Sequence, residues 1–261
     1  KEIEPELDHN EEQIREWLEL NQDAPLISVI IPTYNTNSNH LRECIESVCR
    51  QSYPNWELCI CDDSSSAVSV KTILKSYQSL NPRIKLIFRE KNGHICEASN
   101  DALSLATGEY VALLDHDDIL ADNALYWVAR ELQQKPQANL VYSDEDKISD
   151  NGMRSCPHFK PAFNIDLLLS YNFISHLGVY RREILKEIGG FRVGFEGSQD
   201  HDLALRTVLE SSPDQIIHIP RVLYHWRAHS ESTASNPDSK DYTTESLSLI
   251  HISEPTRQFR I

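Results

Sequence analysis

The sequence YVALLDHDD, residues 110–118, decides the fold of this chain. It begins with an apolar run typical of a strand buried on both faces of a sheet, and its acids follow where that strand ends. Two earlier apolar runs, Leu26–Ile31 and Trp56–Cys61, also end in polar residues, namely PTYN at 32–35 and DDS at 62–64. Ligands of parallel sheets bind beyond the carboxyl ends of the strands, so we expect these polar stretches to meet in one crevice.

Strands and helices are expected to alternate from residue 26 to residue 143. Short apolar runs predict strands, and apolar positions at helical spacing predict helices. The expected strands are 26–31, 56–61, 84–88, 110–114 and 140–143, and the expected helices are 41–51, 70–80, 95–106, 121–134 and 200–210. This order predicts an α/β fold with a mostly parallel central sheet flanked by helices. After residue 147 the alternation weakens, and we expect this part to extend the domain over the crevice.

The expected organisation is one main domain with a segment on either side. Residues 1–24 are acidic, with Ile14, Trp17, Leu18 and Leu20 at the spacing of a short amphipathic helix, which we interpret as a helical linker. The main domain is expected at 25–235. Residues 236–261 form a polar tail that we expect to be mobile, and its last part, 249–261, has no periodicity like that of the rest.

Composition excludes several protein classes. The 261 residues carry 25 Lys and Arg against 40 Asp and Glu, a net charge of −15, which excludes nucleic-acid binding by bulk charge. Hydrophobic residues make up 40%, enough for a core, but no apolar run is long enough to span a membrane and no secretory signal opens the sequence. The cysteines lack CxxC spacing and predict reduced, buried thiols of a cytosolic protein: Cys44, Cys49, Cys59, Cys61, Cys96 and Cys156.

The acidic strand ends suggest ligand chemistry. Clustered carboxylates at 115–118 suit Mg²⁺ or Mn²⁺ shared with substrate phosphates. The alternative is a solvated acidic turn, or a cap for the next helix. Asp62 and Asp63 fit acceptors for a base or ribose, and equally an Asx-type turn.

Two later motifs have similar alternatives. Asp200, at the start of the helix expected at 200–210, fits either an N-cap or a general base. The sequence YHWRAH at 224–229 fits metal and phosphate ligands, or an edge strand with a buried Trp and solvent-facing His and Arg. His176 and His218 lie among apolar residues and are interpreted as structural.

Taken in order, these motifs resemble those of glycosyltransferase family 2. They are PTYN at 32–35, DDSS at 62–65, NG at 92–93, ASN at 98–100, GEY at 108–110, DHDD at 115–118, QDHDL at 199–203 and YHWR at 224–227. The resemblance covers about residues 26–235. It implies the GT-A (Rossmann-like) fold, an inverting mechanism and, from DHDD, SDEDK at 143–147 and HWR, similarity to transferases of bacterial O-antigen and other surface polysaccharides.

The resemblance also implies roles for particular residues. Asp62 would hold the base, uracil or thymine, and Asp115 would contact ribose and pyrophosphate. Asp117 would bind the metal with His229, His225 being the second choice, and Asp200 would be the catalytic base. The remaining nucleotide-binding residues would be Pro32, Thr33, Tyr34, Asn35, Asp63, Asn92, Asn100 and His116. Many relatives have Arg where this chain has Ser99, a position for which Arg89 or Lys91 would substitute.

The activity implied is transfer of a sugar from a nucleotide-diphospho-sugar, with Mn²⁺ or Mg²⁺, to a hydroxyl of a glycan or lipid-linked acceptor. Such an acceptor would bring this cytoplasmic protein into peripheral contact with the inner face of the cell membrane. One alternative is a nucleotidyltransferase, although residues 35–40 lack the glycine-rich, basic phosphate loop that such enzymes use. A second alternative is a non-catalytic module that binds nucleotide-sugars or carbohydrates. A glycosidase would need paired carboxylates but no nucleotide crevice.

Overall fold

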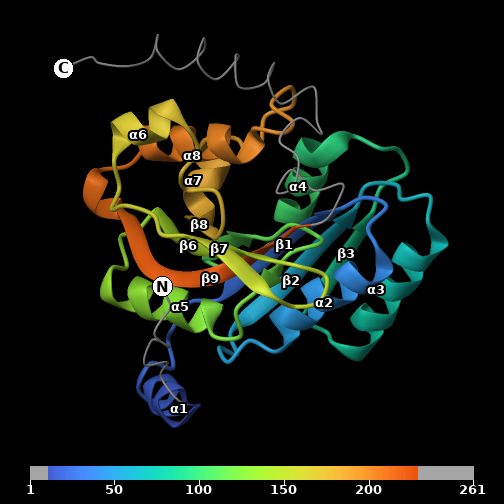
Figure 1. Cartoon of the computed structure of the whole chain (residues 1–261), viewed down its shortest axis with the longest axis horizontal. Coiled ribbons are helices and arrows are strands. Elements are labelled where there is room, and N and C mark those ends of the chain that lie inside the picture. Colours follow the sequence, from blue (N-terminus) through green and yellow to red (C-terminus); the bar gives the residue numbers. More distant parts are fainter. Residues whose placement is uncertain (1–10, 229–261) are drawn as a thin grey trace.

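The structure is a computed structural model that describes residues 11–228. A mixed sheet runs through its centre (Figure 1), and its strands lie in the order β3-β2-β1-β4-β8-β6-β9-β5, with β7 beside β6. The strands are β1 (Ile27–Thr33), β2 (Trp56–Asp62), β3 (Ile84–Phe88), β4 (Tyr110–Leu113), β5 (Ile119–Leu120), β6 (Leu140–Ile148), β7 (Arg154–His158), β8 (Gly178–Arg181) and β9 (Ile216–Arg227).

The strand directions create a crevice next to β1. Strand β1 pairs in parallel with β2 on one side and with β4 on the other, and β2 pairs in parallel with β3. Strand β8 is antiparallel to both β4 and β6, so β6 and its parallel partner β9 run in the direction of β4. The expected α/β class with a mostly parallel sheet is confirmed. The order reverses between β1 and β4, the position at which open α/β sheets bind ligands.

Two hydrophobic cores lie on opposite faces of the sheet, each covered by four helices (Figure 1). One core packs under α1 (Glu11–Leu20), α2 (Ser38–Cys49), α3 (Val68–Leu80) and α5 (Ala124–Gln134). The other packs under α4 (His94–Ser104), α6 (Ile165–Ser170), α7 (Arg182–Glu187) and α8 (Gln199–Leu209).

Side chains of each central strand alternate between these cores. In β2, Trp56, Leu58 and Ile60 belong to the α2/α3 core, whereas Cys59 and Cys61 belong to the α4/α8 core. Because both faces are buried, the strand is apolar apart from Glu57 and Asp62, and its apolar run does not show which side chains face which core.

The second half of the sheet differs most from expectation. Strand β6 was expected to end at residue 143 but continues to Ile148 through three buried acids, Asp144, Glu145 and Asp146. Each acid has an imidazole partner, His218, His176 and His225 in that order, so the strand can bury them. Elements that the sequence did not predict are β5, β7, β8, β9, α6, α7 and a 3₁₀ turn at Pro213–Gln215.

The predictions for the terminal segments and for the cysteines have different outcomes. Helix α1 forms where expected and inserts Ile14 into the core, although Leu20 is 85% exposed. All the cysteines are free, but the expectation of buried thiols is wrong for Cys156, which is exposed in β7. Residues 1–10, the tail 236–261 and His229 lie outside the described residues. Within residues 11–228, no helix is long and apolar enough to cross a bilayer.

Candidate functional site

A cavity of about 510 Å³ opens at the carboxyl ends of β1 and β4, beside α4 and the start of α8. Of the residues expected in a site, it brings together Pro32, Thr33, Tyr34, Asp63, Asn92, Asp115, His116 and Asp200. It does not bring Asn35, Asp62, Asn100 or Asp117 into its lining.

Asp62 and Asp63 point to opposite faces of the sheet. Asp62 continues the alternation of Leu58 and Ile60 toward the α2/α3 core, where it is fully buried and neither carboxylate oxygen accepts a hydrogen bond from a described residue. Asp63, the next residue, lines the cavity instead. The placement therefore gives Asp63, not Asp62, access to a ligand.

Asp63 is held by the loop that follows β3. Its Oδ1 accepts from the backbone N–H of Gly93 at 2.9 Å and lies 3.0 Å from Nε of Arg89. Arg89 also pairs with Glu97 and Asp101, so its guanidinium is engaged with three acids and does not line the cavity. Arg89 is thus not available for a base, while Ser99 occupies the cavity wall.

Two expected nucleotide-binding residues support loops instead. The Oδ1 of Asn35, whose φ of 46° is left-handed, accepts from the backbone N–H of Ser66 at 2.9 Å and joins the loops after β1 and β2. The side chain of Asn100 donates to the Phe191 carbonyl at 2.8 Å and accepts from the Phe191 N–H at 2.9 Å. Both residues shape the cavity from behind its wall.

The DHDD loop divides into cavity and support residues. Asp115 and His116 line the cavity, and His116 Nδ1 donates to the Pro32 carbonyl at 3.1 Å, since a carbonyl can only accept. Asp118 is buried and accepts from the Tyr224 hydroxyl at 2.5 Å and the Arg227 N–H at 2.7 Å. Burial, followed by the charges of Asp117 and Asp115, raises the pKa of Asp118 well above its usual range.

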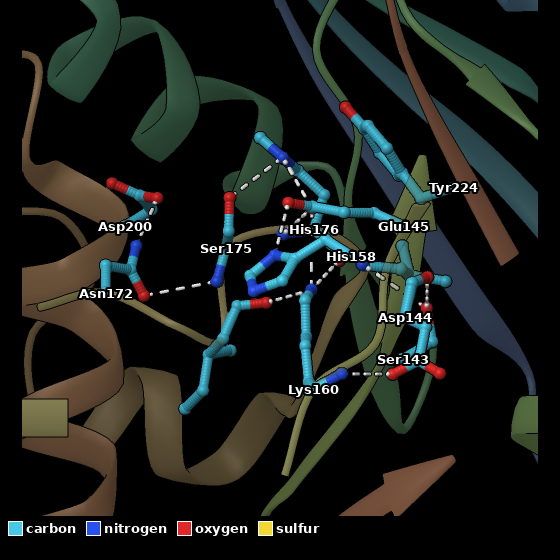
Figure 2. Close-up of polar contacts among 12 residues, drawn as sticks. Ser143, Asp144, Glu145, His158, Lys160, Asn172, Ser175, His176, Asp200 and Tyr224 are labelled. Atoms are coloured by element: carbon cyan, nitrogen blue, oxygen red, sulfur yellow. Dashed lines mark hydrogen bonds and ion pairs between the residues drawn. The ribbon is translucent and has the colours of Figure 1, made fainter. Parts of the chain in front are cut away.

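His176 is a cavity residue, so its interpretation as purely structural is wrong. Its Nε2 lies 3.8 Å from Asp115 Oδ2. Its Nδ1 lies 3.2 Å from Glu145 Oε2, as Figure 2 shows. Burial acts to lower the pKa of His176, but Asp115 and Glu145 outweigh it and raise that pKa well above its usual range. Asp115, Asp118 and His176 each offer a ligand atom, all within 4.8 Å of one another, a donor set that suits a divalent cation.

Asp200 enters the cavity from the start of α8. The N-cap of this helix is Ser198, so the capping alternative for Asp200 is not what the structure has. The carboxylate lines the cavity, and its Oδ2 accepts from Asn172 Nδ2 at 2.7 Å (Figure 2). Asn172 has no sequence signal of its own, because it lies in a segment without periodicity.

The YHWR motif lies in β9, between β6 and β5 and not at an edge. Trp226 lines the cavity, but His225 is buried against Asp146 at 2.6 Å and does not face it. Arg227 is also buried and donates to the Asp117 carbonyl at 2.7 Å, so it braces the DHDD loop. His218 pairs with Asp144 at 2.8 Å, in keeping with the structural interpretation of that residue.

Sequence comparison finds relatives over most of the chain. The profile described as Glycosyl transferase family 2 matches residues 28–189. The uncharacterized protein y4gI of Sinorhizobium fredii is 48% identical over 224 residues, which are 86% of this chain and 25% of that protein. The O-antigen biosynthesis protein RfbC of Myxococcus xanthus is 38% identical over 221 residues, 85% of this chain and 17% of that protein. The chain therefore spans a quarter or less of the length of these relatives.

Solved structures share the fold at low sequence identity. Residues 1–349 of S. aureus TarS, in complex with UDP-GlcNAc, superpose with a TM-score of 0.66 at 22% identity, covering 87% of this chain and 65% of that one. The mannosyltransferase PcManGT from Pyrobaculum calidifontis, in complex with GDP-Man and Mn²⁺, gives a TM-score of 0.67 at 19% identity, covering 96% and 71%. These similarities establish the architecture of the chain.

Proposed function

Since the chain belongs to glycosyl transferase family 2 and has the GT-A fold, we propose that it is an inverting, metal-dependent glycosyltransferase. Its donor is a nucleotide-diphospho-sugar and its acceptor is a hydroxyl of a glycan or lipid-linked saccharide. The observation that carries this proposal is the meeting of Asp63, Asp115 and Asp200, from the segments after β2 and β4 and the start of α8, in one cavity.

Asp63 recognises the base of the donor. Its Oδ1 is engaged by Gly93 and Arg89, so Oδ2 is the oxygen left to accept from a ligand. An ionised carboxylate accepts and does not donate, so it can pair with the ring N–H of uracil, thymine or guanine. We assign this role to Asp63 in place of Asp62, because Asp62 faces the α2/α3 core and Asp63 lines the cavity.

The acids after β4 hold the donor diphosphate through a divalent cation, Mn²⁺ or Mg²⁺. The side chains present fit such an ion, because Asp115 and His176 line the cavity and Asp117 lies in the same loop as Asp115. Burial, and after it the charges of Asp117 and Asp115, raise the pKa of Asp118, and a cation would relieve the repulsion among these acids. Asp117 remains the proposed metal ligand, and His229 its partner. When bound, the cation would neutralise charge on the departing diphosphate.

Asp200 acts as the general base. It stands at the rigid start of α8, accepts a hydrogen bond only through Oδ2 among the contacts described, and faces the cavity. It takes the proton of the acceptor hydroxyl as that oxygen attacks the anomeric carbon from the side opposite the diphosphate. The configuration at that carbon inverts.

The similarity to RfbC supports a place in surface polysaccharide synthesis. A lipid-linked acceptor would put the chain at the inner face of the cell membrane. A binding module without turnover, the alternative to a transferase, would bind the donor but release no nucleoside diphosphate.

The test is a turnover assay with UDP-, dTDP-, GDP- and CDP-sugars, a saccharide acceptor and Mn²⁺. We expect one donor to release nucleoside diphosphate and to give a product of inverted anomeric configuration by NMR. In Asp200→Asn we expect kcat to fall about 10²–10⁴-fold while donor binding persists. Full turnover by Asp200→Asn would refute the base assignment, and donor binding without any turnover by the wild type would favour the binding module.

A further inference from the structure

Asn172 connects Asp200 to the segment that carries His176. Its Nδ2 donates to Asp200 Oδ2 at 2.7 Å, and its Oδ1 accepts from the backbone N–H of Ser175 at 3.1 Å (Figure 2). The two bonds run in a consistent sense, from the Ser175 amide through the Asn172 side chain to the carboxylate.

The orientation of this amide is fixed by its partners. Turning the Asn172 side chain over would put its oxygen against the Asp200 carboxylate and its NH₂ against the Ser175 N–H. Both contacts would then be repulsive, since like groups would face each other. The Asn172 side chain therefore presents its NH₂ group, and not its oxygen, to Asp200.

The segment behind Asn172 is anchored by two buried charged residues. The Lys160 ammonium, whose side chain is fully buried, donates to the carbonyl of Ile174 at 2.6 Å and to that of His176. Glu145 Oε2, on β6, accepts from the His176 N–H at 3.1 Å and lies 3.4 Å from Lys160 Nζ. The backbone from 174 to 176 is thus tied to buried charged groups, and Asn172 is held on a rigid support.

We propose that Asn172 is a positioning residue that fixes Oδ2 of Asp200 and turns its Oδ1 toward the acceptor hydroxyl. A hydrogen bond donated to a carboxylate stabilises the ionised form, which is the form a general base needs. It also removes the freedom of the carboxylate to rotate, because Oδ2 is fixed. This inference rests on the proposed role of Asp200.

Several other titratable groups lie near Asp200. Asp115, His176 and Glu196 share its cavity, and Tyr180 on β8 senses its charge. On α8 itself, His201 binds the Leu168 carbonyl, and Asp202 pairs with Arg192 and Arg206. The Asp200→Asn background, which removes the carboxylate, therefore separates the bond to Asp200 from effects on these other groups.

The experiment measures kcat against pH for Asn172→Ala and Asn172→Asp with the full chain, its donor and an acceptor. A hydrogen bond to a charged group contributes enough that Asn172→Ala should lower kcat about 10–100-fold. The acid limb of the profile should move to higher pH, with donor KM nearly unchanged. The isosteric Asn172→Asp keeps the shape, places a like charge beside Asp200, and should move that limb further.

Asn164→Ala is the matched control, because Asn164 caps α6 through the Leu167 N–H and does not touch Asp200. It should leave the pH profile unchanged. In an Asp200→Asn background, Asn172→Ala should cause no further loss of kcat. An unshifted acid limb in both Asn172 variants, or a full additional loss in the double variant, overturns this inference even if Asp200→Asn alone is inactive. An active Asp200→Asn would instead overturn the proposed function.

Discussion

Nδ1 of His176 lies 3.2 Å from Oε2 of Glu145, and this pair joins a buried strand to the wall of the cavity. Glu145 is in the middle of β6 and also pairs with Lys160 and His158. Charged pairs of the candidate site thus extend into the core, where their contribution to the stability of the protein can be measured separately from catalysis.

Replacing Lys160 by Met should destabilise the protein strongly. Glu145 would keep its imidazole partners but lose the ammonium group that also binds the carbonyls of Ile174 and His176. Removing one partner of a buried pair costs about 3–5 kcal/mol, and urea unfolding should show a loss of that size. The exposed Lys186→Met is the control, and an equally small effect of both changes would contradict the role given to Lys160.

Asp63→Asn should affect nucleotide binding, whereas Asp62→Asn should affect stability. Asp63→Asn removes the charge that faces the cavity, and the Kd for the preferred nucleoside diphosphate should rise about tenfold or more. Asp62→Asn alters a fully buried side chain that does not line the cavity, so the Kd should stay close to that of the wild type, and urea unfolding reports its effect on stability. Calorimetric titration and urea unfolding measure the two effects. Weaker binding in Asp62→Asn than in Asp63→Asn would reverse the assignment.

Asp117→Ala should abolish the part of donor binding that depends on Mn²⁺. The reason is the loss of one carboxylate from the acidic loop, whose backbone stays braced by Arg227. Titrations of donor with and without MnCl₂ measure the difference. Asp122→Ala, at an exposed position just after the loop, should bind like the wild type. An undiminished Mn²⁺ effect in Asp117→Ala would exclude the ligand role.

Stability should fall with acid partly because of Glu57. Burial acts to raise the pKa of Glu57, but hydrogen bonds from Lys85, Thr107 and Ser28 outweigh it and lower the pKa to about 2. Because the folded pKa lies below the unfolded one, the stabilisation is complete above about pH 4.5 and disappears toward pH 2. It amounts to about 3 kcal/mol.

Urea unfolding at pH 5 and pH 2.5 checks this dependence. In Glu57→Gln the stability at pH 5 should be lower and its decline toward pH 2.5 smaller than in the wild type. The exposed Glu210→Gln serves as the control and should follow the wild type. An identical decline in Glu57→Gln and the wild type would show that the buried carboxylate does not govern it.

The sequence was sufficient to predict the strand ends that surround the cavity. Asp115 and Tyr34 follow apolar runs, and parallel strands bring such positions together. It was not sufficient to choose between Asp62 and Asp63, because β2 is buried on both faces and polar residues occur on both of them, so neither face is marked as the one that meets a ligand.

The second half of the sheet could not be predicted from local sequence patterns. Its strand β6 buries acids whose partners, such as His176 and His218, come from distant segments. Local polarity predicts a loop at such a position, whereas the tertiary pairs make it a strand. Asn172 and His176 were missed for the same reason.

The most direct test of the central claim is calorimetric titration of the wild type and Asp115→Asn with UDP, dTDP, GDP and CDP, each with and without MnCl₂. We expect saturable, Mn²⁺-dependent binding of at least one diphosphate whose base has a ring N–H, weakened about tenfold or more in Asp115→Asn. Failure of every nucleotide to bind, or equal affinity of the two proteins, would contradict it.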